Sequence, residues 1–430
     1  MALSKQPYKG ARDFYPSDKR LQKYMFSVWR RVCESFGYEE YDAPILEPLD
    51  IYLAKTGEEI VNEQTYVFED RGGRKVAIRP EMTPTVSRMV AGKRQELAYP
   101  LRWYSIPNLW RYERPQRGRL REHWQLNVDI FGVASNAAEA EIITLVDEIF
   151  KAFGARRDMY EIRLSSRKFI DYLLTDYLNL SAQEAHAVGK LIDRLHKTDK
   201  NKFIEQIDKA VSDKARQTGV VEKLLSLLSV QEITELPEQL QVHESIEELS
   251  LLLNQLQASG IVNARFDITL MRGFDYYTDI VFEVFDLHPD NNRSMLGGGR
   301  YDGLVGLFGV EPVPTVGFGW GDVTLANFLE LHHLLPGNKA ETDLYVALIG
   351  DISPTEAFIA ELRESGLNVA VDLSAKKLGD QLKTADKKGI KHVLVVGEEE
   401  LRSGKFKLKN LDSGEEKALD IPAVVKALKK

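Results

Sequence analysis

Five arginines lie within one short stretch of the chain and could bind phosphate. They lie between two apolar or aromatic runs, Leu101–Trp110 and Trp124–Phe131. The five are Arg111, Arg114, Arg117, Arg119 and Arg121. A guanidinium is a planar fork of donors that matches phosphate oxygens. The cluster therefore predicts a nucleotide or nucleic-acid phosphate as its ligand. On composition alone, a solvated charged loop is the alternative.

Two further polar segments carry groups that could recognise a small ligand. RPEMTP, residues 79–84, holds Glu81 and Thr83, and a carboxylate beside a hydroxyl suits a cation. Thr83 before Pro84 would serve equally well as the start of a helix. RGFDYYTD, residues 272–279, places an arginine, two adjacent tyrosines and an aspartate at the end of a predicted strand. These groups could form the lip of a recognition site.

A glycine-rich stretch, LGGGRYDGL at residues 296–304, does not match the dinucleotide-binding fingerprint. Asp302 falls where the last glycine of a GxGxxG pattern should be, so we do not expect a dinucleotide site. A flexible hairpin loop is the alternative.

The pattern of apolar residues predicts the elements that position these groups. The two runs Leu101–Trp110 and Trp124–Phe131 read as an antiparallel hairpin with a cationic connection, and alternation predicts strands at Phe266–Leu270 and Ile280–Val284. Ser17 is predicted to cap a helix that ends at Gly37. Asn136 followed by Glu139 reads as a capping box that opens a helix closing at Gly154.

Composition and length set limits on the kind of protein. The chain has 430 residues, a net charge of −8 and 43% apolar content, so it can bury large cores but does not bind polyanions through bulk charge. It has one cysteine, Cys33, which excludes an intrachain disulfide or a multi-thiolate zinc site. The eight histidines lack HExxH spacing, and we expect no metal site built by the protein. Without a long apolar run or a signal-like N-terminus, a cytoplasmic location is the default.

The end of the chain has a different pattern from the rest. The segment 331–342 resembles a linker, with Pro336 and Gly337 at its centre. Beyond it, predicted strands at 344–349, 367–373 and 392–396 alternate with predicted helices, one opened by Ser353, Pro354 and Glu356 and one at 375–388. This series predicts a small βαβ sheet domain, a fold that hosts many functions.

Several of these motifs resemble those of one family. RYERPQRGRLREHWQ is similar to the second signature motif of class II aminoacyl-tRNA synthetases, in the form found in histidyl-tRNA synthetases. RGFDYYTDIVFE and LGGGRYDGL resemble the two histidine-specific signatures of that family. For LGGGRYDGL, the resemblance implies that the glycines let the backbone approach the ligand. KGARDFYP resembles the N-terminal signature of the family, and GYEEYDAPILEPLD resembles the first class II motif. The resemblance covers nearly the whole chain.

The resemblance implies a fold and a domain organisation. The fold is an α+β class II synthetase catalytic core, an antiparallel sheet flanked by helices, at residues 1–330. This core includes a helical insertion at about 165–260, to which we assign no chemistry. A linker at 331–342 then leads to a C-terminal α/β anticodon-binding domain at 343–430.

The resemblance also implies a reaction and its partners. Histidine and ATP, as its Mg²⁺ complex, would form histidyl-adenylate, and the histidyl group would pass to the 3′ end of tRNA(His). Fixed cations would stabilise the charge that develops on phosphate and carboxylate oxygens. The first motif implies a homodimer.

Roles for individual residues follow by resemblance. The catalytic groups are Arg111, Arg272 and Gln125. Histidine would be held by Glu81, Thr83, Arg111, Gln125, Asp129, Arg272, Tyr276 and Tyr277. ATP would be held by Arg111, Glu113, Arg121 and His123, and the acceptor end of tRNA by Arg114, Arg117 and Arg119.

Three positions depart from the family pattern. Thr324 or its neighbours stand where the third class II motif, here PTVGFGWGDVTLANFLE, usually has an arginine for the γ-phosphate. Asp129 replaces a glutamate, and His123 replaces a phenylalanine that stacks on adenine. The missing arginine keeps two alternatives open. One is a non-catalytic histidine-binding paralogue of the kind that regulates ATP phosphoribosyltransferase, against which the C-terminal series argues. The other is a synthetase for another amino acid, against which RGFDYY argues.

Overall fold

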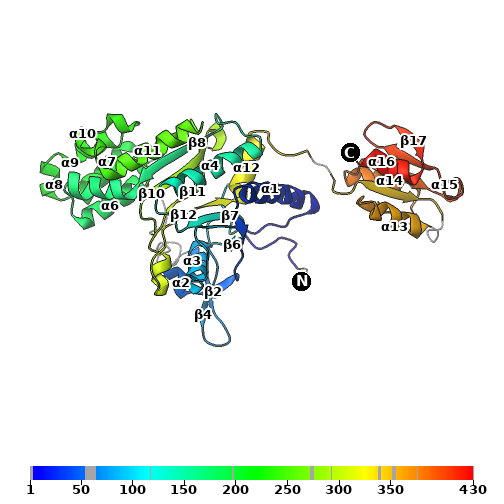
Figure 1. Cartoon of the computed structure of the whole chain (residues 1–430), viewed down its shortest axis with the longest axis horizontal. Helices are drawn as coiled ribbons and strands as arrows, with labels where there is room; N and C mark the ends of the chain where they lie inside the picture. Colours follow the sequence, from blue (N-terminus) through cyan, green and yellow to red (C-terminus); the bar gives the residue numbers. More distant parts are fainter. Residues whose placement is uncertain are drawn as a thin grey trace. The chain divides into compact units, whose positions relative to one another are not determined.

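The computed structural model describes residues 3–53, 64–116, 118–195, 198–271, 276–291, 293–337, 340–350, 355–374 and 376–429. The chain forms two compact units, Met1–Leu335 and Pro336–Lys430 (Figure 1). The division falls within the predicted linker. The predicted Ser353–Pro354 start of a helix lies outside the described residues.

A large mixed sheet organises the first unit. In the described residues its strands follow the order β1-β5-β7-β12-β11-β10-β8-β9, and β6 also pairs with β7. Neighbours are antiparallel except at the two edges, where β1 and β9 run parallel to β5 and β8. The strands are β1 (Glu39–Glu40), β5 (Leu101–Ser105), β6 (Asn108–Trp110), β7 (Glu122–Phe131), β8 (Tyr160–Ser166), β9 (Ala264–Phe266), β10 (Ile280–Asp286), β11 (Ser294–Arg300) and β12 (Thr315–Gly321).

Alternation along the central strands gives this sheet one apolar face. Leu126, Val128 and Ile130 of β7 belong to the main hydrophobic core, together with Val316, Phe318 and Trp320 of β12. Because side chains alternate along a strand, the residues between them must point to the opposite face. Helices α1 (Pro16–Ser35), α4 (Ala137–Ala152) and α12 (Asp322–Leu331) contribute apolar side chains to the same core. The other face of the sheet is therefore available for a site.

The predicted hairpin is confirmed, with a break in its first strand. β5 and β6 both pair antiparallel with β7, and Ile106–Pro107 separates them. The strands on the two sides of RGFDYYTD are β9 and β10. β10 confirms the strand predicted at Ile280–Val284, but β9 coincides with the predicted Phe266–Leu270 only at Phe266. They are not neighbours, because β8 lies between them.

One predicted helix start and one predicted capping box are wrong. The first helix begins at Pro16 with Tyr15 as its N-cap, and Asp18 rather than Ser17 accepts a hydrogen bond at this end, from the Tyr15 amide at 3.0 Å. At α4, Asn136 is the N-cap but its side chain makes no cap hydrogen bond. Glu139 instead accepts hydrogen bonds from Arg300, at 2.6 and 2.7 Å. The buried ion pair takes the carboxylate away from the helix end.

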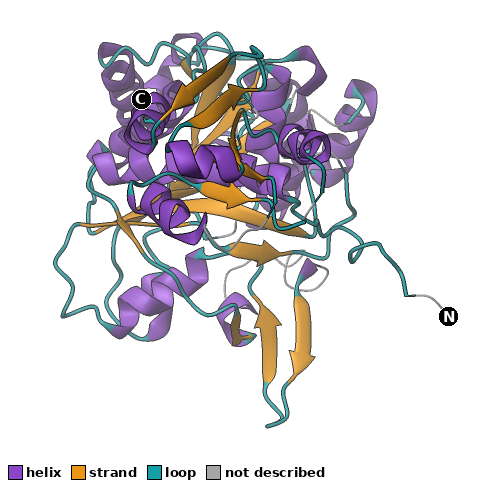
Figure 2. Cartoon of the chain, turned by 90° about the vertical axis from the view of Figure 1, so that its right-hand side faces the viewer, coloured by secondary structure: helices purple, strands orange, loops and turns teal. Residues whose placement is uncertain are grey.

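A small antiparallel sheet lies beside the main one. Its order is β2-β4-β3, from β2 (Leu46–Pro48), β3 (Tyr66–Glu69) and β4 (Lys75–Ile78), so Pro48 is on an edge strand as expected. The β3–β4 hairpin projects from the first unit (Figures 1 and 2). The short helix α2 (Asp50–Leu53) and helix α3 (Thr83–Gly92) follow β2 and β4 in the chain.

The predicted insertion is helical. It begins with α5 (Arg167–Tyr172) and ends with α11 (Glu244–Ala258). Between them lie a π-helical turn (Leu173–Tyr177), α6 (Ala182–Ile192), α7 (Lys200–Ala210), α8 (Asp213–Gln217), α9 (Val220–Leu227) and α10 (Glu238–Gln241).

The second unit is a five-stranded sheet with helices, as far as the described residues extend. Its order is β14-β13-β15-β16-β17, parallel in the first three strands and antiparallel in the last two. The strands are β13 (Leu344–Leu348), β14 (Val369–Val371), β15 (His392–Val396), β16 (Phe406–Asn410) and β17 (Glu416–Leu419); the helices are α13 (Glu356–Glu364), α14 (Leu378–Lys387), α15 (Glu398–Ser403) and α16 (Ile421–Leu428). The βαβ series is confirmed, and the β16–β17 hairpin was not predicted. No helix among the described parts of either unit is both long and apolar enough to cross a membrane.

Candidate active site

A row of polar side chains on β7 forms the floor of the candidate site. Gln125, Asn127 and Asp129 alternate with the core residues of this strand and so share the face opposite to the core. Gln125 donates a hydrogen bond from Nε2 to Oδ1 of Asn127 at 2.7 Å. One strand therefore connects a predicted carboxylate-binding residue, Gln125, to the predicted imidazole-binding residue, Asp129.

Glycines on the neighbouring strand make room for this row. Gly317, Gly319 and Gly321 of β12 pair with Asp129, Asn127 and Gln125. A Cβ at Gly319 would lie 2.5 Å from Nε2 of Gln125, and one at Gly317 would collide with Oδ1 of Asp129. The side chains of the polar row therefore lie over the backbone of β12, which only glycine permits.

A cavity of about 330 Å³ opens at one end of the row. Five of its lining residues are predicted site residues: Arg111, Glu113, Arg119, His123 and Gln125. The rest of the lining is Gln64, Gly118, Leu120, Met295, Gly319, Gly321, Val323 and Thr324. Two guanidiniums and a carboxylate thus face a space that could hold part of a nucleotide.

Local contacts fix the cations of this cavity. Arg111 donates from Nε to the carbonyl of Pro80 at 2.9 Å, and its backbone amide bonds to the carbonyl of Arg121 at 2.8 Å. Arg119 lies 3.8 Å from the carboxylate of Glu113, and its side chain is half exposed. Arg111 is thus held at the wall, while Arg119 extends from a turn that solvent reaches.

His123 is neutral in this setting. Burial, together with the nearby guanidiniums of Arg111 and Arg12, lowers the pKa of its imidazole to about 3. An uncharged ring can stack on an adenine base without adding charge to the cavity.

The other end of the polar row contains a cluster of tyrosines. Tyr301 donates its hydroxyl hydrogen to Oδ1 of Asp129. The ring of Tyr301 lies 5.5 Å from that of Tyr276 and 6.3 Å from that of Tyr277, measured between ring centres. Tyr276 donates to Oε2 of Glu81 at 3.1 Å. Glu81, Asp129 and both predicted tyrosines are therefore brought into one cluster.

Burial changes the protonation of the carboxylate in this cluster. The pKa of Asp129 is raised to about 7 because the carboxylate is removed from water. The hydrogen bond from Tyr301 has the opposite, smaller effect on this pKa. The same burial raises the pKa of Tyr276 and Tyr301 well above its usual value, so both phenols keep their protons. A carboxyl group whose pKa lies near neutral pH can accept a hydrogen bond from a neutral imidazole or form an ion pair with a protonated one.

The remaining predicted residues lie in different places. Thr83 is the first residue of α3. A hydrogen bond between the side chains of Thr83 and Tyr276 acts to lower the pKa of the Tyr276 phenol, against the larger effect of burial. Arg121 does not line the cavity: its guanidinium lies over the ring of Tyr112 at 3.8 Å and donates to the hydroxyl of Tyr8 at 2.9 Å. Arg114 is exposed on the same connection. Arg117 and Arg272 lie outside the described residues.

Motif-based reasoning missed Tyr301. It stands inside LGGGRYDGL, where the glycines drew attention to the backbone. The sequence around it, SMLGGGR, has no alternation that would mark it; in the structure Tyr301 follows β11 directly and its phenol is buried. A buried hydroxyl needs a partner, and Asp129 is one.

The irregular third motif has its own arrangement. Asp322, at the start of α12, is buried and accepts hydrogen bonds from Nη2 of Arg12 at 2.8 Å and from the amide of Trp124 at 3.0 Å. Thr324 donates its hydroxyl hydrogen to backbone carbonyls of Met295 and Gly321, at 2.8 and 2.9 Å. A Cβ at Gly118, in the turn before Arg119, would lie 3.8 Å from Cγ2 of Thr324. The small threonine thus lets this turn approach α12.

Among the described residues, no group of three or more histidine, cysteine, aspartate or glutamate side chains could hold a metal ion.

Comparisons with known proteins agree with this architecture. The fold matches a crystal structure of histidyl-tRNA synthetase from Nostoc sp. PCC 7120 with a TM-score of 0.83 at 24% identity, over 100% of this chain and 99% of that one. It also matches a structure described as an ATP phosphoribosyltransferase regulatory subunit/histidyl-tRNA synthetase from Bacillus halodurans C, with a TM-score of 0.73 at 23% identity, over 92% and 99%. The fold is that of a class II aminoacyl-tRNA synthetase with a C-terminal anticodon-binding domain.

Sequence relatives define the family. The family model described as histidyl-tRNA synthetase matches residues 10–321, and the one described as anticodon binding domain matches 353–430. A histidine–tRNA ligase from Leptospira biflexa is 46% identical over 96% of this chain and 94% of its own length, and one from Thermoplasma volcanium is 36% identical over 98% of each. This chain belongs to the histidyl-tRNA synthetase family.

Proposed function

We propose that this chain is an active histidine–tRNA ligase, which activates L-histidine with ATP and transfers it to the 3′ end of tRNA(His). The observation that carries the proposal is the polar row of β7. It joins the cavity containing Arg111 and Glu113 to the cluster containing Asp129, so two ligands bound there would meet at Gln125.

Histidine would occupy the tyrosine end of the row. Asp129 would bind one imidazole nitrogen, and Tyr277 with Tyr276 the other side of the ring. Glu81 and Thr83 would receive the α-ammonium, as a carboxylate and a hydroxyl can. An amino acid without two ring nitrogens would leave buried polar groups of this cluster unpaired, which is a strong basis for rejection.

ATP, with its Mg²⁺, would occupy the cavity. Arg111 would hold the α-phosphate and the histidine carboxylate, which Gln125 orients; Glu113 would accept from the adenine amino group, and His123 would stack on the base. Arg272 would stabilise the α-phosphate during attack, when negative charge grows on its oxygens. Arg121, held by Tyr8 and Tyr112, would support the wall of this site through its bond to the carbonyl of Glu113, at 3.2 Å.

Arg119 would supply the cation that the third motif lacks. It lines the cavity, and the turn that carries it lies against Thr324, where a long side chain would obstruct it. Arg114 and Arg117 would then contact phosphates at the acceptor end of tRNA, with Arg119 shared between the two ligands.

The proposal includes a cytoplasmic homodimer. The small sheet has a face formed by Leu46, Pro48, Phe68, Val76 and Ile78, and Leu46 and Phe68 are each 44–45% exposed. An apolar face of this kind suits a second copy of the chain. The C-terminal unit would bind the anticodon region of the tRNA.

The second candidate function is a histidine-binding regulatory subunit. The irregular third motif favours it, because Asp322 and Thr324 provide no cation. The experiment that separates the two is charging of tRNA with labelled histidine. We expect ATP-dependent formation of histidyl-tRNA; saturable histidine binding without any charging would contradict the proposal and favour the regulatory subunit.

A further inference from the structure

Asp279 is a buried carboxylate directly after the tyrosine pair, and the proposed mechanism gives it no role. Its residue exposure is 6%, and it lies two positions beyond Tyr277. A buried carboxylate is costly unless it is paired. Its partners therefore indicate what this position does.

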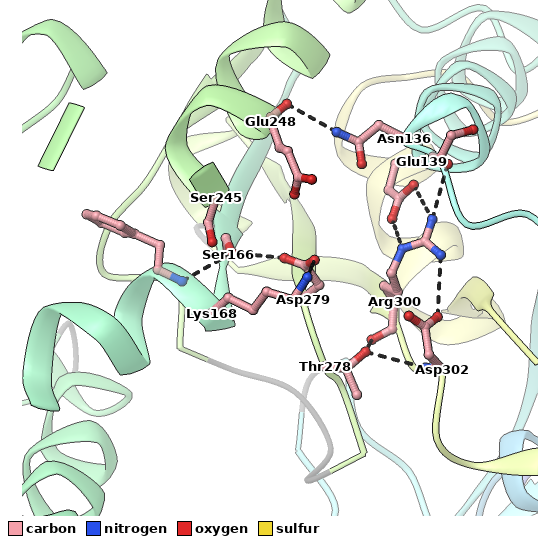
Figure 3. Close-up of polar contacts among 12 residues, drawn as sticks. Asn136, Glu139, Ser166, Lys168, Ser245, Glu248, Thr278, Asp279, Arg300 and Asp302 are labelled. Carbon is pink, nitrogen blue, oxygen red and sulfur yellow. Dashed lines mark hydrogen bonds and ion pairs between the residues drawn. The ribbon is translucent and has the colours of Figure 1, made fainter. Parts of the chain in front are cut away.

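The partners of Asp279 lie where β8 ends and the helical insertion starts (Figure 3). Ser166, the N-cap of α5, donates from Oγ to Oδ1 of Asp279 at 3.0 Å. Lys168 forms an ion pair with Oδ2 at 2.5 Å, and the amide of Arg167 donates to the carbonyl of Asp279 at 3.1 Å. Ser166 is the last residue of β8, and the bond of the Arg167 amide continues the β8–β10 pairing, so the Lys168 ion pair is the side-chain contact that the helical insertion itself makes with Asp279.

The second half of the insertion supports the same contact. The carboxylates of Glu244 and Glu248, on α11, act electrostatically on Lys168, although Asp279 has the largest effect in raising its pKa. The carbonyl of Glu248 also accepts a hydrogen bond from Nδ2 of Asn136 at 3.2 Å, which ties α11 to the start of α4. Both ends of the insertion are therefore fastened near Asp279.

The catalytic core holds the other side of this segment. The amide of Thr278 donates to the carbonyl of Arg300 at 2.8 Å, and Arg300 forms the buried ion pair with Glu139 (Figure 3). Within the first unit, Thr278 thus anchors the segment to the end of β11, and Asp279 anchors it to the end of β8 and the start of α5. The Arg300–Glu139 pair behind Thr278 is buried, whereas Lys168 is 58% exposed, so the ion pair of Lys168 with Asp279 is the more adjustable contact.

We propose that the helical insertion positions the histidine-binding tyrosines Tyr276 and Tyr277 through the contact of Ser166 and Lys168 with Asp279. This inference rests on the proposed function, since it assigns the tyrosines to histidine. Lys168 and Asp279 are positioning residues. Weakening their contact reduces histidine affinity and leaves ATP binding in the cavity unchanged.

The test uses charge reversal in the full-length chain. Lys168→Asp places a carboxylate against Asp279 and Glu248, and we expect the KM for histidine in ATP–pyrophosphate exchange to rise about tenfold, with the KM for ATP unchanged. Adding Asp279→Lys restores an opposite-charge pair and should recover most of the loss. Arg216→Asp is the matched control, because Arg216 pairs with Asp213 on the insertion, and it should leave both KM values unchanged.

A second measurement does not depend on activity. Amide hydrogen exchange of the peptide covering residues 276–281 should be faster in Lys168→Asp and return toward wild type in the double variant. An unchanged KM for histidine with unchanged exchange would overturn the inference, as would equal effects in Arg216→Asp. If the wild type activates no amino acid, the proposed function fails, and the amide exchange alone then decides whether the insertion positions this segment.

Discussion

Tyr301 and Asp129 form a hydrogen bond between two buried side chains that lie 172 residues apart in the sequence. Asp129 comes from the central strand β7, and Tyr301 follows directly after β11. The bond fixes the orientation of the only carboxylate in the polar row, and it opposes the effect of burial on the pKa of that carboxylate. Histidine recognition is therefore expected to depend on a residue that need not itself make the main contact with the ligand.

Removing this hydroxyl should weaken histidine binding. In Tyr301→Phe, Asp129 loses a donor that stabilises its charged form, so its pKa should rise above about 7. We expect the KM for histidine to rise about tenfold at pH 7, with a smaller effect on kcat. Because the carboxylate can still ionise at higher pH, the loss should be smaller at pH 9.

Tyr345→Phe is the control for this variant. Tyr345 donates to Asp372 at 2.6 Å in the second unit, so the substitution removes the same kind of bond. It should leave the exchange reaction unchanged. Equal KM values for Tyr301→Phe and wild type at pH 7 would contradict the role given to the Tyr301 hydroxyl.

The raised pKa of Asp129 also predicts how stability depends on pH. Between its ordinary pKa of 3.8 and about 7, the folded state holds this proton more tightly than the unfolded state does. The group therefore stabilises the fold at low pH, and this stabilisation is lost as the pH rises through 7. Asp129→Asn cannot ionise, so its free energy of unfolding relative to wild type should increase between pH 5 and pH 8, by on the order of 2 kcal/mol.

Urea denaturation at pH 5 and pH 8 measures this difference in the free energy of unfolding. A titration with histidine should show that Asp129→Asn no longer binds this amino acid. A gap between variant and wild type that is the same at pH 5 and pH 8 would mean that Asp129 is already charged in the fold.

The sequence predicted well what depends on local patterns. The two apolar runs predicted the hairpin of β5 and β7, and the arginines between them marked its cationic connection. Partners that are distant in the chain could not be predicted in this way. Glu139 looked like a helix cap because Asn136 stands three residues before it, but its partner is Arg300, 161 residues away.

The glycines of β12 illustrate the same limit. In the sequence, Gly317 and Gly319 interrupt an apolar run and suggest a weak strand. Only the register of β12 against β7 reveals that they lie under Asp129 and Gln125. These glycines leave space for the side chains of the site, and a glycine in a sequence does not show which side chain it makes room for.

Filling this space should impair the reaction. The Cβ of Gly319→Ala would lie 2.5 Å from Nε2 and 3.0 Å from Cδ of Gln125, so that side chain must move. We expect kcat/KM for histidine to fall about a hundredfold, because small displacements of a positioning group have large effects on rate. Gly92→Ala, at the end of α3, has open space around it and is the control. Wild-type kcat/KM in Gly319→Ala would contradict the placement of Gln125 over β12.

Two arginines of the same connection should behave differently. Arg119 lines the cavity, whereas Arg114 is exposed and does not line it. Arg119→Met should raise the KM for ATP in the exchange reaction about tenfold, as expected when a charge-assisted contact to phosphate is lost. Arg114→Met should leave exchange unchanged and raise the KM for tRNA in the charging reaction. Similar effects of both variants on the KM for ATP would contradict the assignment of Arg119 to the triphosphate.

The most direct test of the whole account is amino-acid-dependent exchange of pyrophosphate into ATP by the wild-type chain, measured with each of the twenty amino acids. The polar row and its tyrosine cluster predict exchange with histidine and with no other amino acid. Exchange driven by a different amino acid, or histidine binding without exchange, would contradict the claim that one site joins Asp129 to the arginine-lined cavity for catalysis.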